Sequence, residues 1–148
     1  METEKKKNKI LLIDDDEMMR IFFRDIFWIH GKNDRYEISM AATLEEAEKI
    51  VDDEATRPDT IFMDIFLSST KKSSDASSYQ VNKSLEFIGK IKKNEKLSYI
   101  KIIIYSGQKY QSLEEAVMKL GVNEYLIKGE LMPKEIISFT DKINGSNN

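Results

Sequence analysis

The sequence predicts an α/β domain in which five parallel strands form one doubly wound sheet with helices on both faces. Short apolar runs alternate with segments of helical periodicity five times along the chain. This alternation favours a parallel sheet, because each parallel strand needs a crossover connection to reach the next. The length of 148 residues is typical of one domain, and a hydrophobic content of 41% is enough for a core.

Composition excludes several classes of function. The net charge of −3 disfavours a nucleic-acid-binding surface. The chain has no cysteine, so it can form neither a disulfide nor a cysteine-based metal site. No apolar run reaches the roughly 18 residues of a membrane span, and the first residues lack the apolar region of a signal peptide. We therefore expect a soluble, cytoplasmic protein with no membrane insertion and no nucleic-acid partner.

The first strand and helix follow a charged segment. Residues 1–8 predict a disordered tail, and the apolar run from Lys9 to Ile13 predicts a buried strand. A helix is predicted from Met18 to His30, because apolar residues recur there every three or four positions. The expected core face of this helix comprises Met19, Phe22, Phe23, Ile26 and Phe27.

Three apolar residues of this helix are left over after its core face is assigned. Met18, Ile21 and Trp28 form a neighbouring stripe, where a solvated helix would show polar groups. Two interpretations stay open. The stripe packs under the terminal helix or a long loop, or it is a docking face for a partner helix, since exposed aromatic and methionine side chains are typical interface anchors.

The middle of the chain predicts a second strand, a capped helix and a third strand. The second strand is expected from Tyr36 to Ala42, and Thr43 with Glu46 forms a capping box for the next helix. The run from Thr60 to Leu67 is typical of a strand buried on both faces. It carries one carboxylate, Asp64, near its C-terminal end.

A polar segment then interrupts the pattern. Residues 68–80 are rich in serine and lysine and have little apolar surface to bury, so they predict a long polar loop. Helical periodicity resumes near Val81 and continues to Ile91. A fourth strand is expected from Tyr99 to Tyr105, and it ends on Ser106.

The last third of the chain predicts a helix, a strand and a final helix. The first helix runs from Leu113 to Leu120 and is closed by Gly121. The fifth strand is expected from Glu124 to Ile127 and ends on Lys128. A last helix begins near Pro133, a residue that is favoured in the first turn.

Polar side chains follow four of the predicted strands. They are Asp14 and Asp15 after the first strand, Asp64 on the third, Ser106 after the fourth and Lys128 after the fifth. The carboxyl ends of strands share one edge of a doubly wound sheet, so we expect these groups to surround a single pocket. Three carboxylates close together need a divalent cation, and oxygen-only ligands favour Mg²⁺.

The chemistry of this set of residues indicates phosphoryl transfer. A carboxylate can itself act as a nucleophile and form an aspartyl phosphate, and Asp64 is the candidate nucleophile. A lysine and a hydroxyl, here Lys128 and Ser106, suit the oxygens of a phosphoryl group. Asp16 and Glu17 are expected instead to cap the first helix and to complement its dipole.

Four segments of the chain together resemble the receiver domain of two-component response regulators, of the single-domain, chemotaxis-regulator-like type. They occur in the family's order and spacing: Ile10-Leu11-Leu12-Ile13-Asp14-Asp15, Ile61-Phe62-Met63-Asp64, Ile104-Tyr105-Ser106-Gly107 and Tyr125-Leu126-Ile127-Lys128. The resemblance implies a flavodoxin-like fold with strand order 2-1-3-4-5. The receiver domain is expected over residues 9–143, with the polar loop 68–80 inside it and a tail at 144–148.

The resemblance also implies a phosphoacceptor and a metal site. Asp64 would accept a phosphoryl group from a histidine kinase or a histidine phosphotransfer protein. Asp15 and Asp64 would bind Mg²⁺ directly, and Asp14 would help, often through water. The backbone carbonyl of Phe66 would be a further metal ligand.

By the same resemblance, Ser106 and Lys128 would hold the phosphoryl group, and Tyr125 would move with Ser106 on activation. The change in conformation would alter binding of a downstream protein target. The chain ends without an apparent output module, so the signal is expected to pass through protein contacts. Such a protein would not be an enzyme on external substrates, because it catalyses only its own phosphorylation and dephosphorylation.

The chain departs from the family pattern in three places. Ser68 and Gly129 stand where the family usually has proline, in the second case after a cis bond, and the loop after the nucleophile is longer than usual. A cis bond before a residue other than proline costs about 3–4 kcal/mol. The Lys128–Gly129 bond is therefore predicted to be trans.

Two other functions stay open at this point. Asp14 and Asp16 could supply the nucleophile and second acid of an aspartate-nucleophile phosphohydrolase. The chain could also be a receiver-like interaction module that works unphosphorylated. Turnover of an external phosphorylated substrate would identify the first, and the complete set of acids argues against the second.

Overall fold

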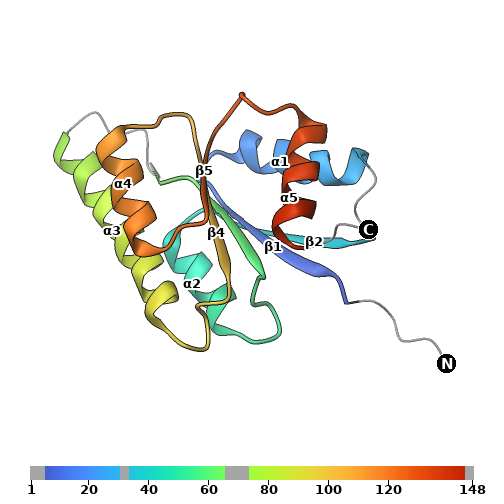
Figure 1. Cartoon of the computed structure of the whole chain (residues 1–148), viewed down its shortest axis with the longest axis horizontal. Helices are drawn as coiled ribbons and strands as arrows, with labels where there is room; N and C mark the ends of the chain where they lie inside the picture. Colours follow the sequence, from blue (N-terminus) through green and yellow to red (C-terminus); the bar gives the residue numbers. More distant parts are fainter. Residues whose placement is uncertain (1–5, 31–33, 66–73, 146–148) are drawn as a thin grey trace.

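The computed structural model of the protein describes residues 6–30, 34–65 and 74–145, and for residues 74–80 the backbone alone. Strands and helices alternate along the chain (Figure 1). The elements are β1 (Asn8–Ile13), α1 (Glu17–Ile29), β2 (Tyr36–Ala41), α2 (Leu44–Asp52), β3 (Thr60–Met63), α3 (Ser74–Lys93), β4 (Lys101–Ser106), α4 (Gln111–Leu120), β5 (Glu124–Ile127) and α5 (Pro133–Ile143).

The five strands form one parallel sheet in the order β2-β1-β3-β4-β5, which confirms the predicted fold class and strand order. Ile13 pairs with Met63, and Met63 pairs with Ile104. The central strands therefore reach the same edge of the sheet at nearly the same level. Residues that directly follow these strands are brought together at that edge.

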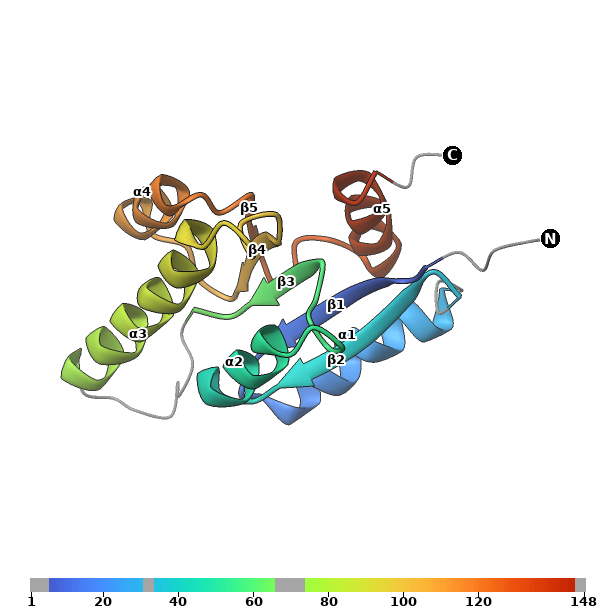
Figure 2. The same cartoon turned by 90° about the horizontal axis from the view of Figure 1, so that it is seen from below.

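Helices cover both faces of the sheet, as Figures 1 and 2 show. Alternate residues of a strand face opposite sides. Leu11 and Ile61 pack in the core beneath α2, α3 and α4, whereas Ile10 and Phe62 pack in the core beneath α1 and α5. All four side chains are fully buried. Burial on both faces explains why the central strands are apolar without alternation.

Local signals set the predicted helix ends. Asp16 caps α1, where its carboxylate accepts hydrogen bonds from the backbone N–H groups of Met18 and Met19. Thr43 caps α2 by accepting a 3.1 Å bond from the N–H of Glu46. α4 ends at Gly121, whose φ of 103° lies in a region that residues with a Cβ rarely adopt. The three caps confirm the predicted helix ends, but the capping box is incomplete, because Glu46 accepts from the N–H of Ala42 and not from that of Thr43.

The start of α3 corrects the predicted loop. The helix begins at Ser74, so residues 74–80 are helical and do not belong to the polar loop expected at 68–80. Buried residues such as Phe87 and Ile88 hold the helix on the sheet. Extending a helix that already exists costs much less than nucleating one, which allows a serine-rich segment to join it. Residues 68–73 lie outside the described residues.

The folded part of the chain extends further toward both ends than predicted. Asn8 already belongs to β1, and its N–H donates to the carbonyl of Arg35 at 2.9 Å. The side-chain oxygen of Asn144 accepts a 2.9 Å hydrogen bond from the buried hydroxyl of Thr60. Asn144 therefore anchors the end of α5 to the sheet. Residues 1–5 and 146–148 lie outside the described residues.

α1 carries more apolar side chains than it buries in the core. Phe23, Ile26 and Phe27 are buried, but Phe22 is 48% exposed, so its assignment to the core face was wrong. Each residue turns the helix by about 100°, and Phe22 falls beside the buried stripe. Met18 is 71% and Trp28 is 70% exposed. Two residues of the leftover stripe therefore face solvent, whereas its third residue, Ile21, is half-buried.

No helix in the described ranges is both long enough and apolar enough to cross a lipid bilayer.

Candidate functional site

Three charged side chains meet at the carboxyl edge of the sheet. The ammonium of Lys128 donates to Asp14 Oδ2 at 2.6 Å and to Asp64 Oδ2 at 2.9 Å. Lys128 is 114 residues from the first partner and 64 from the second, so tertiary structure alone brings them together. Lys128 follows the edge strand β5, and its long side chain spans the width of β4 to reach the acids.

Backbone hydrogen bonds extend the sheet by one residue to hold this cluster. The N–H of Asp14 donates to Ala41 on β2, and the N–H of Asp64 donates to Ile13 on β1 at 2.9 Å. The N–H of Lys128 donates to the carbonyl of Ser106 at 2.7 Å. The backbone of each residue is therefore fixed by a neighbouring strand, while its side chain takes part in the charged cluster.

Burial and charge compete at Asp14. Burial raises the pKa of this carboxyl group, and the hydrogen bonds from Lys128 and from the N–H of Asp16 offset only part of that effect. The pKa of Lys128 is also raised: burial lowers it, but the hydrogen bonds and charges of Asp14 and Asp64 outweigh burial. The lysine therefore stays protonated and acts as the resident cation between two acids.

The oxygen donors of this cluster fit a hard cation. The carboxylates of Asp14 and Asp64 converge on one point, which the ammonium of Lys128 occupies. Mg²⁺ prefers oxygen ligands of this kind and carries charge of the same sign. The described residues nevertheless contain no group of three acidic or histidine side chains arranged around one point. Asp15 is half-buried, and Phe66 lies outside the described residues.

Ser106 and Tyr125 form a second unit beside the charged cluster. Both side chains are buried, and the hydroxyl of Tyr125 donates to the carbonyl of Gln108 at 2.6 Å. The N–H of Gln108 donates in turn to the hydroxyl of Ser106 at 3.4 Å. Burial raises the pKa of Tyr125 to about 12, against the opposing effect of a hydrogen bond with Ser106. The two hydroxyls thus tie the strand ends to the segment that leads into α4.

Lys128 is followed by Gly129, where the family usually has proline, and the bond between them is trans. No cis peptide bond occurs among the described residues, which confirms the predicted trans bond between Lys128 and Gly129. Gly129 has a φ of 91°, and glycine adopts this conformation without steric cost.

Two residues of the site were missed at the sequence level. Gln108 holds Tyr125 through its backbone carbonyl, a group that every residue has, so no sequence signal could indicate it. Arg20 donates a 2.8 Å hydrogen bond to the backbone carbonyl of Asp14. An arginine in the first turns of a helix that follows an acidic segment was a usable signal for that contact.

The comparisons with known proteins identify the family of this chain. A family model described as the response regulator receiver domain matches residues 10–139. The chain therefore belongs to the response regulator receiver family, whose members act in two-component signalling and are in general not enzymes. No curated protein matches the chain.

Solved structures show the same fold at low sequence identity. A CheY-like response regulator receiver domain protein from Methanospirillum hungatei has a TM-score of 0.72 and 19% identity, over 95% of this chain and 96% of that one. The phosphorylated cyanobacterial phytochrome response regulator RcpA has a TM-score of 0.69 and 19% identity, over 94% and 92%. The Mn²⁺-bound form of the response regulator Rcp1 has a TM-score of 0.65 and 19% identity, over 93% and 92%.

Proposed function

We propose that this protein is a phospho-accepting signalling receiver in which Asp64 takes a phosphoryl group from a histidine kinase or a histidine phosphotransfer protein. The observation that carries the proposal is the ammonium of Lys128 held between Asp14 and Asp64. In the transfer, an oxygen of Asp64 bonds to phosphorus while the phosphorus–nitrogen bond of the donor's phosphohistidine breaks. The imidazole nitrogen leaves with the electron pair.

Exposure supports Asp64 over Asp14 as the nucleophile. The side chain of Asp14 is 1% exposed and that of Asp64 is 12% exposed. A donor protein must bring its phosphoryl group into contact with the attacking oxygen, which a fully covered carboxylate does not permit. Asp14 has the supporting role of a fixed negative charge behind the nucleophile.

Charge compensation is the main requirement of this reaction. We assign Mg²⁺ to Asp14, Asp15, Asp64 and the Phe66 carbonyl, and the bound ion would neutralise developing charge on the phosphoryl oxygens. The Mn²⁺-bound form of Rcp1 and the phosphorylated form of RcpA lend support, although they share little sequence with this chain. Lys128 has three N–H donors and pairs with an oxygen of the transferred group.

The switch follows from the contacts of Ser106 and Tyr125. We expect the hydroxyl of Ser106 to donate to the phosphoryl group on Asp64. That donation withdraws Ser106 from the N–H of Gln108, and it loosens the segment that also holds the hydroxyl of Tyr125. The start of α4 then shifts and changes the affinity for a downstream protein target.

The exposed stripe of α1 supports a docking role in the same proposal. Met18, Phe22 and Trp28 are largely exposed on a helix that begins two residues after Asp15. Aromatic and methionine side chains are typical anchors of protein interfaces. We assign this stripe to contact with the phosphodonor protein. A cytoplasmic location for this encounter stays a prediction.

The structure weakens the phosphohydrolase alternative. That function needs Asp16 as a second acid beside the reaction centre, but its carboxylate is occupied by the N–H groups of Met18 and Met19 at the helix cap. An unphosphorylated interaction module would not require a buried pair of acids with a shared lysine. The charged cluster is costly to bury and favours a chemical role.

One experiment tests the proposal directly. The protein is incubated with Mg²⁺ and acetyl phosphate or phosphoramidate, and intact mass is measured with and without the metal. We expect the gain of one phosphoryl group, dependent on Mg²⁺ and absent in Asp64→Asn. Modification of that variant at the wild-type level, or steady hydrolysis of a small phosphomonoester, would contradict the proposal.

A further inference from the structure

A groove lies between α3 and α4 on the sheet face opposite α1 and α5. The two helices run side by side, as both views show (Figures 1 and 2). The groove has a volume of about 770 Å³, and its apolar lining comprises Leu85, Gly89, Ala116 and Leu120. The groove is wide and open to solvent, which suits a surface of a partner protein better than an enclosed small ligand.

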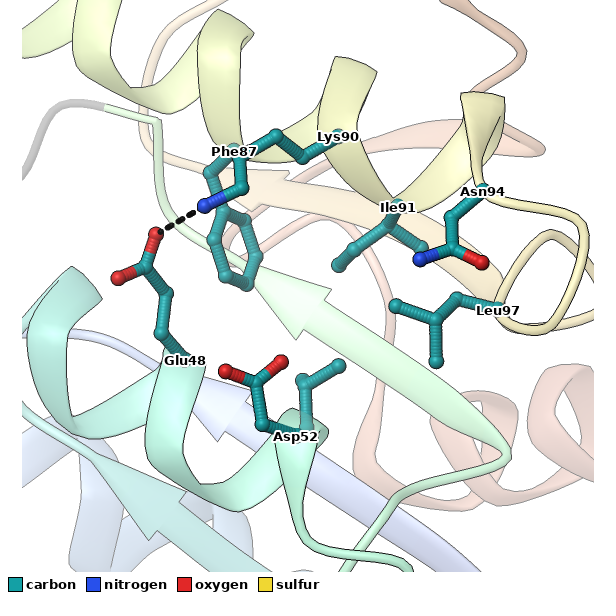
Figure 3. A pocket seen from close by; sticks show the side chains of 8 residues that line it. Glu48, Asp52, Phe87, Lys90, Ile91, Asn94 and Leu97 are labelled. Atoms are coloured by element: carbon teal, nitrogen blue, oxygen red, sulfur yellow. Dashed lines mark hydrogen bonds and ion pairs between the residues drawn. The ribbon is translucent and has the colours of Figure 1, made fainter.

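The neighbouring pocket between α2 and α3 offers no comparable space. It has a volume of about 80 Å³. Figure 3 shows Lys90 and Glu48 bridging it, and the ammonium–carboxylate distance is 3.3 Å. Of the two, the α3–α4 groove can therefore take large side chains from a partner.

Gly89 lines the groove and has no side chain that would narrow it. A glycine inside a helix is destabilising by about 1 kcal/mol relative to alanine. A Cβ atom at Gly89 would meet only one side-chain atom, of Leu120, at an ordinary contact distance of 3.8 Å. Gly89 is buried, and packing within the protein does not require glycine here, so a side chain added at this position would extend toward Leu120 on the other wall of the groove.

The charges beside the groove are mainly positive. Lys90, Lys93 and Lys119 line it together with one acid, Glu86, in a chain with a net charge of −3. Lys90 is paired with Glu48. Within the described ranges, neither Lys93 nor Lys119 makes a salt bridge, and both are exposed. Two cations are thus placed to meet acids on a partner.

We propose that this groove binds an acidic amphipathic helix of a partner protein. Leucine-like side chains of that helix enter between Gly89 and Ala116, and its flanking carboxylates pair with Lys93 and Lys119. Positive charge at the end of α3 and α4 also complements the helix dipoles. Replacing these lysines can therefore also change the stability of the helices, so the stability of each lysine variant is measured together with its affinity for the peptide. The groove is formed without phosphorylation, so the proposal stands apart from the chemistry of Asp64.

The test uses three synthetic helical peptides with identical leucine positions. The positions flanking the leucines are all glutamate in the first peptide, all glutamine in the second and all lysine in the third. Each is titrated into the ¹⁵N-labelled full chain, unphosphorylated, and also into Asp64→Asn. We expect the glutamate peptide to bind about tenfold more tightly than the glutamine peptide, with shifts centred on residues 85–93 and 116–120. The proposal is overturned if the glutamate peptide does not bind, or if the lysine peptide binds with equal affinity. It is also overturned if the chemical-shift changes are centred on other residues.

Variants with matched controls complete the test. Gly89→Leu fills the groove without removing a contact, and we expect it to lower affinity for the glutamate peptide more than tenfold. Ala116→Leu fills it from the other wall, should the first variant be misfolded. Ser138→Leu, on the exposed side of α5, adds the same side chain elsewhere and should leave affinity unchanged. Unchanged binding by both groove-filling variants overturns the proposal.

A charge test uses two double variants with the same net charge. Lys93→Glu with Lys119→Glu reverses the charge beside the groove, and Lys49→Glu with Lys134→Glu reverses exposed lysines on α2 and α5. We expect affinity for the glutamate peptide to fall at least tenfold in the first double variant and less than twofold in the second, at low salt. An equal loss in both would show a general charge effect and would overturn the assignment.

Discussion

The ammonium of Lys128 donates a 2.6 Å hydrogen bond to the fully buried carboxylate of Asp14. This contact places a positive charge at the back of the site, where burial would otherwise favour a protonated acid. The second bond of the ammonium, to Asp64, shares that charge with the candidate nucleophile. Any cation or phosphoryl group that enters the site must rearrange this pair of bonds.

Asp64→Asn is expected to abolish phosphorylation by a small acyl phosphate. The amide keeps the shape of the side chain and can still accept a hydrogen bond from Lys128, but it has no nucleophilic oxygen. The free energy of unfolding should therefore change by about 1 kcal/mol or less. Intact mass measures the first effect and urea denaturation the second. A loss of several kcal/mol would show that Asp64 is chiefly structural.

Lys128→Met is expected to destabilise the protein and to increase its response to Mg²⁺. The methionine keeps most of the aliphatic stem but leaves two buried acids without a cation, at a cost of about 3 kcal/mol. Mg²⁺ should recover more stability in this variant than in the wild type, because the ammonium no longer competes for the same oxygens. Urea unfolding with and without Mg²⁺ measures both effects. Lys134→Met is the exposed control, and an equal Mg²⁺ response in all three proteins would rule out the shared site.

Tyr125 is expected to make the protein less stable at high pH. Its pKa is raised to about 12 in the folded protein, from 10. Between these values the unfolded chain loses the phenolic proton and the folded protein keeps it, so stability is fully present below pH 10 and falls by about 1.4 kcal/mol per pH unit above it.

Tyr125→Phe isolates this effect from other groups that titrate in the same range. At pH 7 the variant should be less stable by about 1 kcal/mol, because the hydrogen bond to the carbonyl of Gln108 is lost. At pH 11 the difference should vanish or reverse, because phenylalanine has no proton to lose. Denaturation at both pH values tests this. A constant difference would mean that the hydroxyl is not buried as described.

Trp28→Ala is expected to slow phosphoryl transfer from the cognate donor protein more than about tenfold, a typical effect of removing an interface anchor. Phosphorylation by a small acyl phosphate should be unchanged, because Trp28 is outside the charged cluster. The side chain is 70% exposed, so stability should change by about 0.5 kcal/mol or less. Tyr99→Ala removes an exposed aromatic between α3 and β4 and serves as control. Equal loss with both phosphodonors would contradict a docking role.

Features that depend on near neighbours in the chain were predictable from sequence. The cap of α1 by Asp16, the cap of α2 by Thr43 and the stop of α4 at Gly121 all involve contacts within a few residues. The bounds of β5 and the start of α5 were also predicted correctly, because apolar spacing and Pro133 mark them. The start of α3 was not, since cooperative extension from packed residues outweighed the weak helix propensity of a serine-rich segment.

The assembly of the site was predictable in part. Strand alternation and polar residues after four strands indicated that Asp14, Asp64 and Lys128 would share one edge of the sheet, and the structure brings them together. Among the described residues no group of three acids surrounds one point, because Lys128 stands between Asp14 and Asp64, and the metal ligands stay a prediction. Sequence order places residues at an edge but does not say which side chain fills the space there.

The sequence by itself determined the alternation of strands and helices and the fold class, because apolar periodicity carries that information locally, whereas the strand order was implied by the family resemblance. Only the tertiary structure decided that Phe22 and Trp28 face solvent, since the width of the apolar surface that α1 buries depends on how α1 and α5 pack over the sheet. The tertiary structure also creates the groove between α3 and α4. Its walls come from residues near 89 and 116, which meet only when two helices are docked side by side on one face of the sheet.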